Sequence, residues 1–170
     1  MMKKNIILIG MMGCGKTTVG RLLSQRLNRP LIDTDALIEE RQGRAIPDIF
    51  AQEGEAHFRA LELELCQELS GQDGLVIACG GGLPLRDEAI AALKQNGLVF
   101  WLDRDPGETY DGLDVSGRPL AQAGRDDFLA RYAVRSPIYH RWADYIIPCA
   151  DGPQEAERLI STIYTEVSEA

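Results

Sequence analysis

The sequence predicts an α/β protein of one domain, with a parallel sheet of five strands covered by helices on both faces. Short apolar runs rich in Ile, Leu and Val alternate with longer stretches whose apolar residues recur at helical spacing. A glycine-rich segment, Gly10–Thr18, lies between the first apolar run and the first helical stretch. Because ligands of such sheets collect at the carboxyl ends of the strands, we expect the functional residues at that edge.

The chain has 170 residues, enough to bury a core without disulfide or metal support. Its formal net charge of −8 argues against nonspecific binding of nucleic acid, and no apolar run is long enough to span a membrane. The four cysteines are widely spaced and form no Cys-x-x-Cys pair, so neither a zinc site nor a disulfide framework is indicated. We therefore expect a cytoplasmic protein with no membrane or nucleic-acid partner.

Gly10–Thr18 has the G-x-x-x-x-G-K-[ST] pattern of a phosphate-binding loop. It follows Asn5–Ile9, an apolar run typical of a buried strand, and precedes Val19–Leu27, which has helical periodicity. Glycines let backbone N–H groups converge on a phosphate, the lysine adds a cation, and the next hydroxyl can ligate Mg²⁺. A chance glycine-rich turn is the weaker alternative. The nucleotide-binding candidates are Gly13, Cys14, Gly15, Lys16, Thr17 and Thr18, with Lys16 also catalytic and Thr17 also a metal ligand.

The other elements continue the alternation of strands and helices. Further strands are expected at residues 30–35, 75–79, 98–102 and 145–148. Helices are expected at residues 36–41, across 46–69 with a joint at Gly54, and at 86–95, 127–136 and 153–167. Proline lacks an N–H group, so we expect the helix that begins at Asp127 to break near Pro137.

Asp103–Asp126 has little apolar periodicity and carries glycines and prolines among charged residues. An irregular stretch of about twenty residues inside a compact domain is typically functional. In a phosphotransferase it can serve as a lid that keeps water away from the terminal phosphate. We expect a mobile lid over residues 107–126.

Acidic residues end the expected second strand, and glycines follow the third. One of Asp33 and Asp35 could hold Mg²⁺ while the other orients an acceptor hydroxyl, or the two could form a solvated strand end or helix N-cap. Gly80–Gly82 indicates close approach of backbone to a ligand or another loop. By residue type alone, Arg59 could equally form a surface ion pair, because Glu62 follows three residues later. Asp103, after the fourth strand, is a weaker metal candidate than Asp33.

The ordered motifs resemble those of the shikimate kinase family over nearly the whole chain. They are GMMGCGKTT (10–18), DTD (33–35), GEAHFR (54–59), CGGG (79–82), RPL (118–120) and RSPIYH (135–140). The resemblance implies a three-layer P-loop kinase fold with a mobile lid. It also implies transfer of the γ-phosphoryl group of ATP to the 3-hydroxyl of shikimate, in chorismate and aromatic amino-acid biosynthesis. ATP and Mg²⁺ are the implied cofactors, shikimate the small-molecule partner, and a monomer the implied state.

The resemblance also implies roles for individual residues. Asp33 would support the metal through water, and Asp35 would be catalytic and contact the acceptor hydroxyls. Arg118, in the lid, would close on the transferring phosphate and so be both catalytic and nucleotide-binding. The implied substrate-binding residues are Asp35, Arg59, Gly80, Gly81, Gly82 and Arg135, within or near a substrate-binding segment over residues 33–62.

The chain departs from the family pattern at Asp111, where members commonly carry an arginine that lies over adenine. Tyr110 or another group must then stack on adenine, or adenine is held weakly. Three other functions are alternatives: a gluconate kinase, a GTPase-like switch and a kinase-like protein without catalysis. The glycine run and RPL favour shikimate, no N-K-x-D motif occurs, and Lys16, Asp35 and the paired arginines are retained.

Overall fold

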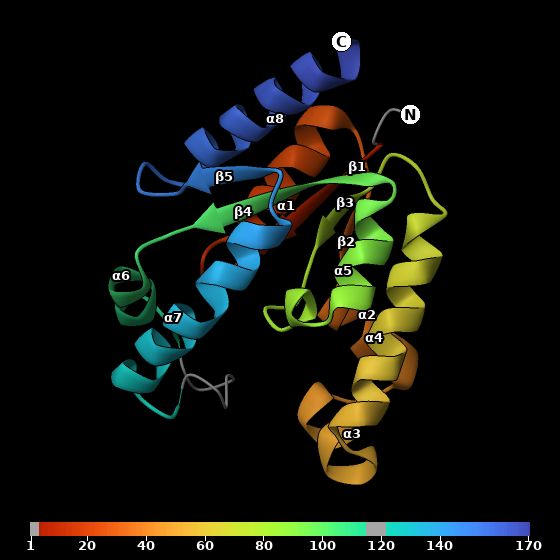
Figure 1. Ribbon diagram of the computed structural model, residues 1–170, viewed down its shortest axis with the longest axis vertical. Coiled ribbons are helices and arrows are strands. Elements are labelled where there is room, and N and C mark those ends of the chain that lie inside the picture. Colours follow the sequence, from red (N-terminus) through yellow and green to blue (C-terminus); the bar gives the residue numbers. More distant parts are fainter. Residues whose placement is uncertain (1–3, 115–121) are drawn as a thin grey trace.

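The computed structural model describes residues 4–114 and 122–170. A parallel sheet of five strands runs through the molecule in the order β2-β3-β1-β4-β5, which confirms the predicted sheet (Figure 1). In the described ranges, the strands are β1 (Asn5–Ile9), β2 (Leu31–Asp33), β3 (Val76–Ala78), β4 (Gly97–Asp103) and β5 (Tyr145–Pro148). β1 lies at the centre, where its backbone pairs with β3 on one side and β4 on the other.

Helices cover both faces of the sheet. Those described are α1 (Lys16–Leu27), α2 (Thr34–Gln42), α3 (Ile46–Glu53), α4 (Glu55–Ser70), α5 (Asp87–Lys94), α6 (Pro106–Asp111), α7 (Arg125–Trp142) and α8 (Pro153–Glu169), with a short 3₁₀ helix, η1 (Leu83–Leu85). Side chains of β1 alternate between the faces. Ile6 and Leu8 join the core under α1 and α8, and Ile7 and Ile9 join the core under α4, α5 and α7.

The segment after β4 is more regular than the sequence predicted. Residues 106–111 form α6, because the Asp105 carboxylate accepts a hydrogen bond from the Glu108 N–H at 2.9 Å and Pro106 occupies the first turn. These capping residues act over too short a stretch to produce helical periodicity. The expectation of an irregular chain over residues 103–126 is therefore wrong for this part.

The predicted break of α7 at Pro137 is also wrong, since the helix runs on to Trp142. Tertiary packing holds the turns on either side of the proline. Arg135 before it and Tyr139 after it are both buried, and the Tyr139 ring packs on Trp101 with ring centroids 5.9 Å apart. A local proline penalty is thus outweighed by burial of the same helix face.

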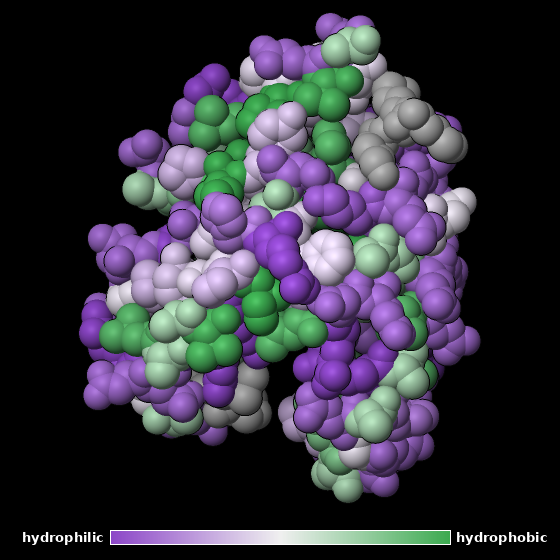
Figure 2. Space-filling view, in the orientation of Figure 1, coloured by the Kyte–Doolittle hydropathy of each residue, from purple (hydrophilic) through white to green (hydrophobic). Residues whose placement is uncertain are grey.

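Two groups of helices stand apart beyond the sheet. α3 and the adjoining end of α4 lie on one side, and α6 with the first part of α7 lies on the other (Figure 1). The space-filling view shows the surface notched between them (Figure 2). In the described part of the chain, no helix is both long and apolar enough to cross a membrane.

Candidate active site

The phosphate-binding loop joins β1 to α1 and has the backbone that its glycines predict. Gly10, Gly13 and Gly15 have φ angles of 148°, 78° and 105°, a region that side chains strongly disfavour. Gly15 caps α1 without a side-chain hydrogen bond, so the first N–H groups of α1 have no capping side chain. Such a helix start attracts anions through its N–H groups and its dipole.

Lys16 and Thr17 begin α1 at this loop. The Lys16 Nζ donates to the carbonyl oxygens of Gly10 and Met11, at 2.6 and 2.9 Å, which holds the ammonium group over the loop. The Thr17 hydroxyl donates to Oδ2 of Asp33 at 3.4 Å. The two sequence-predicted metal residues therefore lie side by side.

Asp33 is the helix N-cap that the sequence offered as an alternative, and it also lies beside Thr17. Its Oδ1 caps α2 by accepting from the Ala36 N–H at 3.0 Å, while its Oδ2 faces Thr17. Within residues 4–114 and 122–170 no cluster of three or more His, Cys, Asp or Glu side chains could hold a metal. A Mg²⁺ ion fits here only with Thr17, Asp33 and phosphate oxygens sharing its coordination, which suits the oxygen preference and retained waters of this ion.

Asp35 lies in the first turn of α2, and not at the end of a strand as predicted, because the cap at Asp33 starts the helix two residues earlier. A Cβ at Gly80 would lie 2.5 Å from Oδ1 of Asp35, so this carboxylate needs a glycine beside it. Between the two acids, Thr34 is buried and accepts a hydrogen bond from the Gly80 N–H at 3.0 Å. Burial and the nearby Asp33 raise the pKa of Asp35, while Lys16 opposes the shift.

Arg59, on α4, forms an ion pair with Glu62, the acid that the sequence offered as its partner. Its Nη1 donates to Oε1 of Glu62 at 2.8 Å, and the Glu62 side chain is only 1% exposed. A Cβ at Gly82 would lie 2.9 Å from Nη2 of Arg59. The Arg59 Nε is buried without a hydrogen-bond acceptor among the described residues, although Glu55 lies 3.5 Å away. The predicted ion pair of Arg59 therefore forms, but inside the protein and not at its surface.

A sequence signal for Glu62 was available. Glu62 falls on the same helical face as Phe58 and Leu65, both of which are buried. A charged residue at a core-facing position needs a partner, and Arg59 lies three residues earlier on α4. Burial raises the pKa of Glu62, and Arg59 acts in the opposite direction.

Gly81, the middle glycine of the Gly80–Gly82 run, is held by α7. The Tyr139 hydroxyl donates to the Gly81 carbonyl at 2.7 Å. Arg135 lies one turn earlier on α7, and a Cβ at Gly81 would lie 3.2 Å from its Nη1 and 3.7 Å from the carbonyl oxygen of Gly10. Gly81 thus lies between α7 and the phosphate-binding loop, which brings Arg135 to the site. The role of Tyr139 in holding Gly81 was not predicted.

The predicted lid is only partly described. Arg118 and the rest of the RPL motif lie outside the described residues. Tyr110 packs on Phe128 with ring centroids 5.5 Å apart, so its ring is engaged in the contact between α6 and α7. Asp111 forms an ion pair with Arg125 at 3.1 Å. Asp111 therefore presents no cation to a nucleotide.

Asp103, the weaker metal candidate, is engaged elsewhere. Its carboxylate accepts a hydrogen bond from the Tyr132 hydroxyl at 2.7 Å. Burial and this bond raise the pKa of Tyr132 to about 12.

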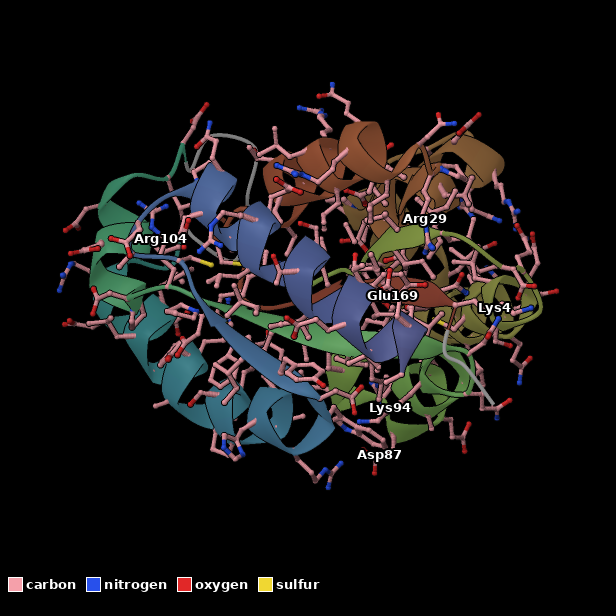
Figure 3. The ribbon with its side chains drawn as sticks, turned by 90° about the horizontal axis from the view of Figure 1, so that it is seen from above. Lys4, Arg29, Asp87, Lys94, Arg104 and Glu169 are labelled. Atoms are coloured by element: carbon pink, nitrogen blue, oxygen red, sulfur yellow. The ribbon has the colours of Figure 1, made fainter. Side chains whose placement is uncertain are left out.

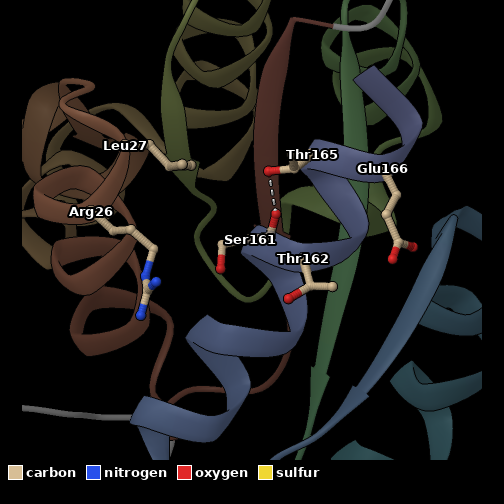
Figure 4. Close-up of a pocket in the computed structure, with 6 residues that line it drawn as sticks. All are labelled: Arg26, Leu27, Ser161, Thr162, Thr165 and Glu166. Carbon is tan, nitrogen blue, oxygen red and sulfur yellow. Dashed lines mark hydrogen bonds between the residues drawn. The ribbon is translucent and has the colours of Figure 1, made fainter. Parts of the chain in front are cut away.

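A separate cavity of about 340 Å³ lies between α1 and α8 (Figure 4). It is lined by Arg26, Leu27, Ser161, Thr162, Thr165 and Glu166. The hydroxyls of Thr162 and Thr165 donate to carbonyls of α8 itself, at 2.8 Å each. Arg26 and Leu27 end α1, about 15 Å from its start at Lys16 by the helical rise, so this cavity is not part of the phosphate-binding site.

The parallel sheet, the loop after β1 and the polar residues beyond β2 and β3 define a P-loop protein of the nucleotide-dependent kinase class. A sequence model of the shikimate kinase family matches residues 12–167. The chain belongs to the shikimate kinase family.

Individual relatives agree with this assignment. The chain is 43% identical to a shikimate kinase of Symbiobacterium thermophilum, over 97% of this chain and 94% of that protein. It is 41% identical to a shikimate kinase of Clostridium botulinum, over 86% of this chain and 88% of the relative.

Solved structures give the same family. The structure of a shikimate kinase from Acinetobacter baumannii in complex with shikimate has a TM-score of 0.86 and 36% identity, covering 96% of this chain and 94% of that one. The shikimate kinase of Aquifex aeolicus has a TM-score of 0.81 and 35% identity, covering 95% and 96%. The fold prediction is confirmed.

Proposed function

We propose that this protein transfers the γ-phosphoryl group of ATP to the 3-hydroxyl of shikimate, giving shikimate 3-phosphate and ADP in chorismate and aromatic amino-acid biosynthesis. The observation that carries the proposal is the convergence of one carboxylate and two guanidinium groups on Gly80–Gly82, beside the phosphate-binding loop. A hydroxylated carboxylate suits this set, because guanidinium groups bind the carboxylate and Asp35 faces the hydroxyls.

The phosphates of ATP would lie along Gly13–Thr18, with Lys16 neutralising their charge. When bound, Mg²⁺ would be held by Thr17 and, through water, by Asp33, and would supply further neutralisation of the phosphate oxygens. Phosphoryl transfer through a loose transition state depends on positioning and cations more than on a strong base. These groups fit that requirement.

Asp35 would orient the acceptor hydroxyl and take its proton late in the transfer. The raised pKa of its carboxyl group makes it a better proton acceptor than an exposed aspartate. Arg59 and Arg135 would hold the shikimate carboxylate, with Glu62 and Tyr139 fixing the groups around them. A role for Arg118 on the transferring phosphate rests on the sequence alone.

We also propose that the chain acts as a cytoplasmic monomer and as one domain, with residues 33–62 as the acceptor-binding segment. The single sheet, which all the described strands join, supports the one domain. Analytical ultracentrifugation of the active protein would test the monomer, and a dimer would overturn it.

The experiment that tests the function is a coupled assay of ADP release with ATP and Mg²⁺. The acceptors are shikimate, quinate, gluconate and nucleoside monophosphates. Turnover with shikimate alone is the expected result. Turnover only with another acceptor would show that Asp35, Arg59 and Arg135 serve a different substrate. ATP binding without turnover of any acceptor would favour a regulatory protein.

A further inference from the structure

The order of the strands gives a direction to the bound nucleotide. The acceptor residues gather beyond β2 and β3, on one side of the loop that follows β1. The γ-phosphate must point to that side for transfer to occur. The nucleoside must then extend the other way, over the ends of β4 and β5.

Arg104 lies on that second side. It is the first residue after β4, is half-buried, and places its Nη1 3.5 Å from the carbonyl oxygen of Gly13 in the phosphate-binding loop. Figure 3 labels it beside the chain that leads from β4 into α6. Burial raises the pKa of the Cys149 thiol to about 12, and the positive charge of Arg104 opposes this shift. The guanidinium is therefore also within electrostatic reach of the loop after β5.

The acids next to Arg104 are engaged with other groups. Asp103 accepts from the Tyr132 hydroxyl, and Asp105 caps α6. Across residues 4–114 and 122–170, no carboxylate forms an ion pair with Arg104, although most arginines of this part of the chain have one. The Arg104 guanidinium is thus half-buried and has no carboxylate partner in the described part of the chain, although the protein has a net charge of −8. Such a group is suited to bind an electron-rich or anionic ligand.

The two residues that the sequence singled out for the adenine, Asp111 and Tyr110, have contacts of their own. Asp111 repels phosphate and is already paired with Arg125, and the Tyr110 ring is packed on Phe128. We propose that Arg104 binds the nucleoside end of ATP, its planar guanidinium stacking on the base as the nucleotide leaves the phosphate-binding loop. This inference rests on the proposed function insofar as ATP is the phosphoryl donor.

The test is the affinity of the protein for ATP and for inorganic tripolyphosphate, measured by calorimetry without an acceptor. Arg104→Ala is expected to weaken ATP binding about tenfold and leave tripolyphosphate binding unchanged, since the second ligand has no base to stack on. Arg104→Lys keeps the charge but not the planar group, and is expected to lose most of the same affinity. Arg125→Ala, which removes an exposed arginine of the same region, is the matched control and should bind ATP as the wild type does.

The kinetic readout should separate binding from chemistry. Arg104→Ala should raise the KM for ATP and leave kcat at saturating ATP within about twofold, as expected for a uniform binding contact. An equal loss of affinity for ATP and tripolyphosphate would overturn the proposal, because it would make Arg104 a phosphate contact. Unchanged ATP affinity would overturn it as well.

The outcomes also separate this inference from the proposed function. A wild-type protein that binds ATP but phosphorylates a different acceptor would end the proposed function and leave the Arg104 comparison intact. A wild-type protein that binds no ATP would end both.

Discussion

On the acceptor side of the site, Arg59 is paired with Glu62, whose side chain is 1% exposed; on the nucleoside side, Arg125 is paired with Asp111, whose side chain is 64% exposed. Breaking a buried pair leaves a charge without compensation, whereas an exposed pair contributes little. The acceptor side is therefore preorganised by buried contacts, and the nucleoside side depends more on the backbone of the phosphate-binding loop. Variants of the two sides should differ in what they change.

The largest effect is expected from Asp35→Asn, which keeps the shape of the acceptor side and removes its charge. Turnover should fall by about 10²–10⁴, the usual size of a lost proton acceptor or orienting group. ATP affinity should change little, because Asp35 faces Gly80 and not the loop glycines. Steady-state kinetics with calorimetry of ATP binding measure both quantities. Unchanged turnover would remove Asp35 from the mechanism.

Lys16→Met tests the phosphate-binding side and should have the next largest effect. Removing one preorganised cation from the phosphate site is expected to lower kcat by about 10²–10³. Binding of shikimate alone should survive, since Lys16 contacts the loop carbonyls and none of the acceptor arginines. Normal turnover by this variant would contradict the nucleotide assignment.

Glu62→Gln addresses the buried pair directly. Loss of the charge that orients Arg59 should raise the KM for shikimate about tenfold while leaving the KM for ATP unchanged. Glu55→Gln is the matched control, because Glu55 also approaches Arg59 but is 61% exposed. If both variants raised the KM for shikimate equally, the burial of Glu62 would not explain how Arg59 is oriented.

Tyr139→Phe should have a smaller effect, seen in stability. It removes the hydrogen bond to the partly buried Gly81 carbonyl and should lower the free energy of unfolding by about 1–2 kcal/mol. Tyr145→Phe is the control, because Tyr145 stacks on Phe100 and its hydroxyl has no hydrogen bond to another described residue. Urea unfolding of the two variants measures the difference, and equal stabilities would contradict the role given to Tyr139.

The sequence predicted the edge of the sheet where the candidate residues gather and the backbone of the phosphate-binding loop, because both depend on local pattern. The glycine spacing of Gly10–Thr18 fixes backbone geometry within nine residues, and the strand periodicity fixes the order of elements. The sequence offered Glu62 as a partner of Arg59 in a surface pair, and the burial of Glu62 was not predicted. Tyr139 was missed because its role arises only when α7 packs against the chain after β3. The continuation of α7 past Pro137 was missed for the same reason, since tertiary packing decided it.

The smallest expected effect concerns the pH dependence of stability, and it distinguishes buried from exposed carboxylates. Burial raises the pKa of Asp35 above its ordinary value of 3.8. At a pH between the pKa of the unfolded chain and the raised pKa of the folded protein, the folded protein holds a proton that the unfolded chain has lost. Unfolding then releases protons, and the free energy of unfolding falls as pH rises through this window. Asp35→Asn has no such group and should flatten this fall, with higher stability than the wild type at neutral pH.

The matched control is Glu68→Gln, since Arg41 lowers the pKa of this exposed carboxyl group. A lowered pKa contributes stability that is present above the ordinary value of 4.5 and lost as pH falls, so removing Glu68 should make the decline toward neutral pH slightly steeper. Urea unfolding at several pH values from about 3.5 to 7 measures both slopes. If the free energy of unfolding of Asp35→Asn changed with pH as that of the wild type does, burial of the Asp35 carboxylate would not destabilise the folded protein. The acceptor side would then not be a preorganised site that costs stability.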